Sequence, residues 1–208
     1  MKKLSPLYIS EFRDLMNYSD YGYRNFSNLN GKDDWGRICS LMDWIEAWVN
    51  EIEDINTNKN NRHKDTINIA QFILGIDTIV SAIKHLTDYF NINNKDLLTS
   101  KNIFTKEYFT NETDYNYFKK IRTTCAIHPY DIHAGNGKKY YAGWIVNDFI
   151  DDQNFNIFIY HDLFGNRDIC LIVKKIELLL FAKAWNNKII ELNNHLYQII
   201  SPNFPKRR

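Results

Sequence analysis

The sequence lacks an excess of charge of either sign and any long, uncharged apolar run. Its 208 residues include 26 Lys and Arg against 25 Asp and Glu, so the net charge is +1. This balance argues against a strongly basic nucleic-acid-binding surface over the whole chain, although it is compatible with a local basic patch. A membrane-spanning helix needs about 18 consecutive uncharged apolar residues, and no stretch of the sequence approaches that length. We therefore expect no membrane-spanning helix.

Paired cysteines and a secretory leader are also missing. The cysteines are odd in number and form no Cys-x-x-Cys pair; they are Cys39, Cys125 and Cys170. Each lies in an apolar stretch, which is typical of buried free thiols in a reducing compartment. No apolar segment follows the first lysines, so we expect no signal peptide. These features predict a cytoplasmic protein without a membrane segment.

The apolar residues that are present follow helical periodicity over most of the chain. Residues 34–55 and 65–91 carry apolar side chains at spacings of three and four, which predicts two long amphipathic helices. Similar patterns predict two shorter helices over residues 7–17 and 114–128 and a third long helix over residues 174–200. Residues 18–32, rich in Asn, Ser, Tyr and Gly, have the composition of a loop, and residues 92–112 are predicted to form a polar connection.

The pattern changes to strand-like alternation ahead of the last helix. Residues 140–147, 155–163 and 168–173 predict an antiparallel hairpin of two or three strands, with a turn at Gly165-Asn166. We therefore predict a mainly α fold: a helical bundle forming one domain over residues 1–208. A small antiparallel β-hairpin, at about 140–173, is inserted before the last long helix.

Arg122 carries the most informative chemistry. It shares one helical stripe with Tyr115, Phe118 and Cys125, so it interrupts an apolar face. A guanidinium in such a place is costly unless it is paired. It must meet a carboxylate, a backbone carbonyl, an anionic ligand or a partner chain, and its planar fork is well suited to phosphate.

His128 follows six residues later, where Pro129 ends the predicted helix. Six residues at about 100° each leave the two side chains roughly 120° apart on an ideal helix. One undistorted helix would therefore not direct both at the same atom, whereas two such helices crossing at a dimer interface would bring both pairs into one cleft.

Arg122, five intervening residues, His128 and Pro129 resemble the signature of the HEPN family. The resemblance is closest over about residues 115–130. The residue after the arginine, commonly Asn, Asp or His in that family, is Thr123 here. The resemblance implies an all-α, usually dimeric protein that cleaves RNA without a metal or other cofactor, as a toxin or host-defence effector with a cognate inhibitor. It implies that His128 acts as general acid or base and that Arg122 neutralises charge developing on phosphorus.

Several neighbouring residues are candidate contacts to RNA. Lysine side chains would bind phosphates, and an aromatic ring such as Tyr130 or Trp144 would stack on a base. The candidate RNA-binding residues are Lys119, Lys120, Thr123, Tyr130, Lys138 and Lys139.

Two other interpretations stay open. One is a catalytically silent helical bundle that dimerises or binds a partner protein, and pairing of Arg122 with Glu46, Asp77 or Glu177 would favour it. The other is a metal-dependent hydrolase built on metal-capable residues, although their spacing matches no standard zinc pattern. Those residues are His128, Asp131 and His133, with His161-Asp162 on the hairpin.

Overall fold

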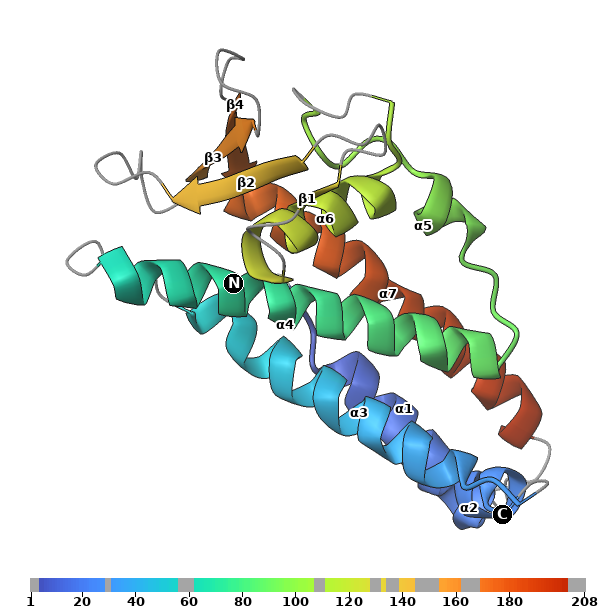
Figure 1. Cartoon of the computed structure of the whole chain (residues 1–208). Helices are drawn as coiled ribbons and strands as arrows, with labels where there is room; N and C mark the ends of the chain where they lie inside the picture. Colours follow the sequence, from blue (N-terminus) through green and yellow to red (C-terminus); the bar gives the residue numbers. More distant parts are fainter. Residues whose placement is uncertain are drawn as a thin grey trace. The chain divides into compact units, whose positions relative to one another are not determined.

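The computed structural model describes residues 4–28, 31–55, 62–106, 111–127, 132–133, 139–144, 154–161 and 169–201 (Figure 1). Its helices are α1 (Leu7–Asn17), η1 (Tyr18–Asp20), α2 (Tyr21–Phe26), α3 (Asp34–Glu51), η2 (Ile52–Asp54), α4 (Arg62–Tyr89), α5 (Lys95–Thr99), α6 (Asp114–Arg122), η3 (Thr123–Ile127) and α7 (Lys175–Ile200). The strands, all between η3 and α7, are β1 (Ile132–His133), β2 (Lys139–Trp144), β3 (Asn154–His161) and β4 (Ile169–Lys174). The predicted fold class, mainly α with a small antiparallel sheet before the last long helix, is confirmed.

The chain forms two compact units, and α4 and α7 contribute residues to both. The first unit comprises Met1–Glu53, Thr78–Asn94 and Ala182–Arg208, and the second comprises Asp54–Asp77 and Lys95–Phe181. The single domain predicted over residues 1–208 stays a prediction.

The first unit is a helical assembly built on apolar stripes that the sequence predicted. Ile38, Met42, Ile45 and Val49 of α3 are all buried, as expected from their spacing. Helix α3 begins where Asp33 accepts a hydrogen bond from the backbone N–H of Gly36 at 2.9 Å, which is an N-cap. Two apolar residues of the predicted helices 7–17 and 174–200, Leu7 of α1 and Ile199 of α7, are nevertheless exposed.

The loop predicted over residues 18–32 is wrong in part, because η1 and α2 occupy its first half. Positive φ angles at Ser19 and Asp20 turn the chain sharply after α1. The Phe26 ring then contacts Phe90 at a centroid distance of 5.4 Å, and Trp35 packs so closely on Gly22 that no Cβ would fit there. These tertiary contacts stabilise a helix that local composition does not favour.

In the second unit, a four-stranded antiparallel meander in the order β1-β2-β3-β4 packs one face inward. Phe155, Ile157 and Ile159 of β3 are buried, and Phe155 meets Phe72 of α4 at a centroid distance of 6.3 Å. A second aromatic cluster joins the segment after α5 to α6 and α7; its members are Phe104, Tyr117, Phe118 and Phe181. The strand β1 was not predicted, since two residues carry no readable alternation.

Asp114 anchors the segment between α5 and α6. Its buried carboxylate accepts hydrogen bonds from Lys106 Nζ at 2.6 Å and from the Ser100 hydroxyl at 2.6 Å. It also accepts from the backbone N–H groups of Asn102, Ile103 and Phe104 at 2.9, 3.1 and 3.4 Å. Thr113 is the N-cap of α6, because its hydroxyl oxygen accepts a hydrogen bond from the backbone N–H of Asn116 at 3.3 Å. Asp114 therefore holds the preceding loop through its carboxylate.

Helix α4 is long and apolar enough, by length and composition alone, to cross a membrane. An 18-residue window within Lys64–Tyr89 has a mean hydropathy of 1.6, and 50% of it is buried. The buried half includes Ile69, Ile73 and Ile76, which pack in the protein interior. Because this test uses length and composition only, the expectation that no helix spans a membrane stays a prediction.

We predict that Asp114→Asn lowers the free energy of unfolding by about 3 kcal/mol, because it leaves the Lys106 ammonium buried without its counter-charge. The Lys106 side chain is only 7% exposed, so water cannot replace the carboxylate. Urea unfolding at neutral pH measures the change. Asp14→Asn, at an exposed carboxylate of α1, is the control and should change stability by less than about 0.5 kcal/mol. Equal stability of the two variants would contradict the proposed anchor.

The same residue should make stability depend on pH. Burial alone would raise the pKa of Asp114, but the hydrogen bonds from Lys106, Ser100 and the backbone outweigh it and hold this pKa below its ordinary value of 3.8. A depressed carboxyl pKa contributes stability above the unfolded-state pKa, and this contribution is lost as pH falls through the folded-state pKa. The stability difference between the native protein and Asp114→Asn should therefore shrink in urea titrations below about pH 4. A constant difference would contradict this.

Candidate functional site

Arg122, the last residue of α6, is paired with Asp77 of α4. Its Nη1 lies 3.1 Å from both carboxylate oxygens of Asp77, and the two side chains are 27% and 22% exposed. Phe118 and Cys125, on the same stripe, are buried as predicted. The apolar stripe is thus interrupted by a charge, and a carboxylate on the neighbouring helix compensates it.

The Asp77 contact leaves the guanidinium incompletely satisfied. Only one terminal nitrogen, Nη1, reaches the carboxylate, so the pair is not the two-nitrogen fork that arginine and carboxylates form at their strongest. The Nε of Arg122 is buried and has no hydrogen-bond partner within the described ranges. Buried donors in native proteins nearly always have an acceptor, so this one requires an explanation.

The helix is distorted immediately after Arg122. Residues Thr123–Ile127 form a π-helical turn, η3, in place of a further turn of α-helix. Such turns are rare, are usually short interruptions of α-helices, and occur frequently at functional sites. The undistorted helix assumed in the sequence analysis is therefore wrong in this segment, which separates Arg122 from His128.

The structure places the other described candidates around this turn with their own partners. Lys119 is exposed, and its ammonium lies 4.4 Å from the centroid of the Tyr115 ring. Lys120 binds Glu112 at 2.7 Å, which leaves it less available for phosphate. Thr123 is half-buried at the start of η3. Lysines and arginine do gather in the last turn of α6, as that helix ends with Lys119, Lys120 and Arg122.

Several predicted residues lie outside the described residues. These are His128, Pro129, Tyr130, Asp131, Lys138 and Asp162. For another group the structure gives the place in a strand only: His133 in β1, Lys139 and Trp144 in β2, and His161 in β3. The roles predicted for all of them stay predictions.

The described residues offer neither a reactive cysteine nor a grouped set of metal ligands. Burial raises the pKa of the Cys125 thiol, so it is not a nucleophile at neutral pH. All three cysteines are free, and Cys39 and Cys170 are half-buried rather than buried as predicted. Among the residues that the structure describes, no three His, Cys, Asp or Glu side chains are grouped to hold a metal ion.

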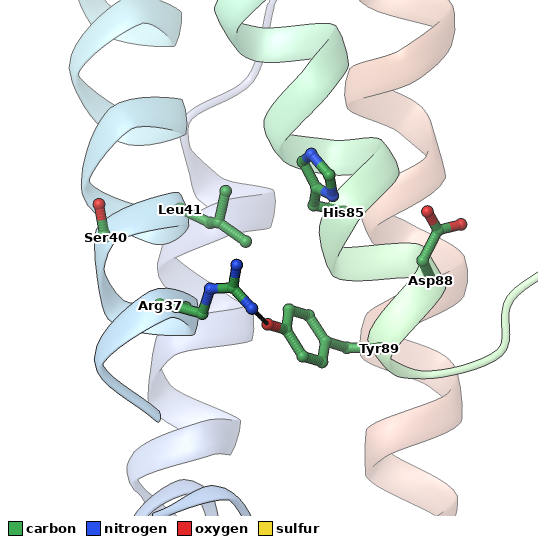
Figure 2. A pocket seen from close by; sticks show the side chains of 6 residues that line it. All are labelled: Arg37, Ser40, Leu41, His85, Asp88 and Tyr89. Carbon is green, nitrogen blue, oxygen red and sulfur yellow. Dashed lines mark hydrogen bonds between the residues drawn. The ribbon is translucent and has the colours of Figure 1, made fainter. Parts of the chain in front are cut away.

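The first unit contains a surface groove of about 590 Å³ between α3 and α4 (Figure 2). Its cationic residue Arg37 donates to the Tyr89 hydroxyl at 3.4 Å and lies 3.7 Å from Asp34. On α4, Asp88 is paired with Lys84 at 2.8 Å. Because these opposite charges are matched, the groove has no net positive charge to attract phosphate. Arg122 does not line this groove, since it belongs to the other unit.

Comparison with protein family models, curated proteins and solved structures finds no match to this chain. The site must therefore be interpreted from its own residues.

We predict that Arg122 and Asp77 are energetically coupled by about 1–2 kcal/mol, between the values for exposed and for buried ion pairs. Urea unfolding of the native protein, Arg122→Ala, Asp77→Ala and the double variant measures this coupling. The control cycle uses Lys84 and Asp88, an i,i+4 pair whose side chains are 32% and 51% exposed. That control should give about 0.3–0.5 kcal/mol. A smaller coupling for Arg122 and Asp77 than for the control would mean that the contact does not join α6 to α4 in solution.

Proposed function

We propose that this chain is a metal-independent endoribonuclease of the HEPN type, acting in the cytoplasm as a homodimer. The observation that carries the proposal is the setting of Arg122. It is a partly exposed guanidinium, bound from one side by Asp77, at the start of the π-helical turn that leads along the chain to His128. A charge, a helix distortion and a histidine in succession are more typical of a reactive centre than of a packing contact.

The chemistry would use the ribose 2′-hydroxyl of RNA as the nucleophile. His128 would accept the 2′-hydroxyl proton, or would protonate the departing 5′-oxygen, because an imidazole with an ordinary pKa near ~6.5 exchanges protons at neutral pH. The 2′-oxygen then forms a bond to phosphorus as the bond to the 5′-oxygen breaks. The products are a 2′,3′-cyclic phosphate and a 5′-hydroxyl. Arg122 would stabilise the negative charge that develops on the phosphoryl oxygens.

Asp77 would hold the guanidinium in position for this task. Asp77 binds Nη1 and does not occupy the other terminal nitrogen, which would donate to a phosphoryl oxygen. The toxin or defence role, the cognate inhibitor and the dimer belong to the same proposal and rest on the resemblance to the family.

The same ion pair favours a second candidate, a catalytically silent bundle that binds a partner protein or a second copy. Asp77 already neutralises Arg122, so no phosphate is needed to explain an arginine in the apolar stripe. This candidate predicts that Arg122 contributes to stability and to nothing else.

A cleavage assay separates the two candidates. The full chain is incubated in excess EDTA with structured and single-stranded RNAs, beside Arg122→Ala and His128→Ala. Loss of either side chain should slow cleavage by about 100-fold or more, the usual effect of removing a charge-stabilising group or an acid–base catalyst.

Matched controls are Arg13→Ala and His195→Ala. Arg13 binds Asp43 and Glu46 and is 29% exposed, so its loss breaks a comparable ion pair away from the motif. Both controls should cleave at the native rate per folded molecule. If native protein, Arg122→Ala and His128→Ala do not differ, the silent bundle is the correct candidate.

A further inference from the structure

The outer face of the sheet presents a cluster of aromatic rings, formed by Tyr141 of β2 with Phe158 and Tyr160 of β3. In an antiparallel pair, directly opposed residues share a face, and here Tyr141 is opposite Tyr160 while Gly143 is opposite Phe158. Tyr141 and Tyr160 are 41% and 43% exposed. The alternate residues of β3 on the inner face are buried, whereas on the outer face the exposure of the described residues rises along β3 from buried Asn156 through half-buried Phe158 to exposed Tyr160.

Gly143 fixes the position of one ring in this cluster. A Cβ at position 143 would lie 2.7 Å from Cε2 of Tyr160, closer than real contacts allow, so the Tyr160 side chain rests on the backbone of β2. The Tyr160 ring is also nearly parallel to Phe158, with centroids 6.1 Å apart and an interplanar angle of 26°. The rings therefore form an ordered aromatic surface rather than isolated exposed side chains.

The charge of the strands indicates what kind of partner fits this surface. The four strands contain no Asp or Glu, but they contain Lys139 and Lys174 and two histidines. Lys174 is paired with Glu177 at 3.3 Å, and the strand register places Lys139 at the end of the sheet where Tyr141 and Tyr160 lie. Aspartates also occur in the sequence between the strands, at positions 145–153 and 162–168, which lie outside the described residues. Aromatic rings beside cationic residues complement unpaired bases on a phosphate backbone.

We propose that the outer face of this sheet binds single-stranded RNA by stacking bases on Tyr141 and Tyr160. The choice of RNA rests on the function proposed above, since β2 contacts the π-helical turn that follows Arg122 (Figure 1). Bases stacked on β2 and β3 would hold an unpaired strand within the unit that carries Arg122. The substrate class is then unpaired RNA, because a duplex buries the faces of its bases.

The test measures binding apart from cleavage. Full-length His128→Ala protein is titrated in EDTA into a fluorescein-labelled single strand of about 12 nucleotides, within the range of about 4–16 that one such surface covers. Fluorescence anisotropy gives Kd, and the same sequence as a duplex is the comparison. Tyr141→Ala and Tyr160→Ala should each raise Kd by about 5- to 150-fold, the effect of losing one stacked base.

Three further variants distinguish stacking from general damage to the fold. Tyr141→Phe and Tyr160→Phe keep the rings and should bind like the parent protein. Gly143→Ala displaces the Tyr160 ring while keeping every aromatic residue, and should weaken binding as Tyr160→Ala does. Tyr23→Ala, at a 61% exposed tyrosine of the first unit, is the control and should leave Kd unchanged.

The outcomes separate this inference from the proposed function. If the native protein cleaves RNA but Tyr141→Ala and Tyr160→Ala leave Kd unchanged, the sheet inference alone is overturned. Ring-dependent binding by a chain that does not cleave RNA would support the sheet inference and overturn the ribonuclease. A dimer that dissociates in the Tyr141→Ala/Tyr160→Ala variant, without RNA binding by the parent, would overturn the inference in favour of a protein interface.

Discussion

The second unit depends on how one charge, the guanidinium of Arg122, is accommodated where α6 packs through apolar residues. Asp77 on α4 compensates it through a single nitrogen, and the helix continues past that point only as a π-helical turn. The compensation is partial, because Nε stays buried without an acceptor among the described residues. The π-helical turn η3, which follows Arg122 in the sequence, also contacts β2.

This partial compensation is what makes the pair informative about function. A purely structural ion pair gains most when both terminal nitrogens meet the carboxylate and all buried donors are satisfied. Arg122 meets the carboxylate through one terminal nitrogen, and its side chain is 27% exposed. A cation in this state is expected to be able to bind a second anion. The aromatic face of β2 and β3 lies in the same compact unit as Arg122.

The sequence predicted those features that repeat along the chain. The stripe from Ile38 to Val49 and the alternation in β3 both follow from local periodicity. It also placed Asp77 among the carboxylates that would pair with Arg122. Long-range contacts were not predictable in this way: α2 forms through Trp35 and Phe90, Asp114 binds a loop that precedes it, and Tyr160 needs Gly143 on another strand. The π-helical turn has no local signature in residues 123–127.

The chemical identity of the RNA ends tests the central claim most directly. Products made by the native protein in EDTA are isolated and their termini are determined by mass spectrometry. Attack by the ribose 2′-hydroxyl predicts 2′,3′-cyclic phosphates and 5′-hydroxyls, and it predicts that a single 2′-deoxy substitution at a cleaved position protects that bond. Ends with 3′-hydroxyls and 5′-phosphates, or cleavage at the deoxy position, would contradict the account.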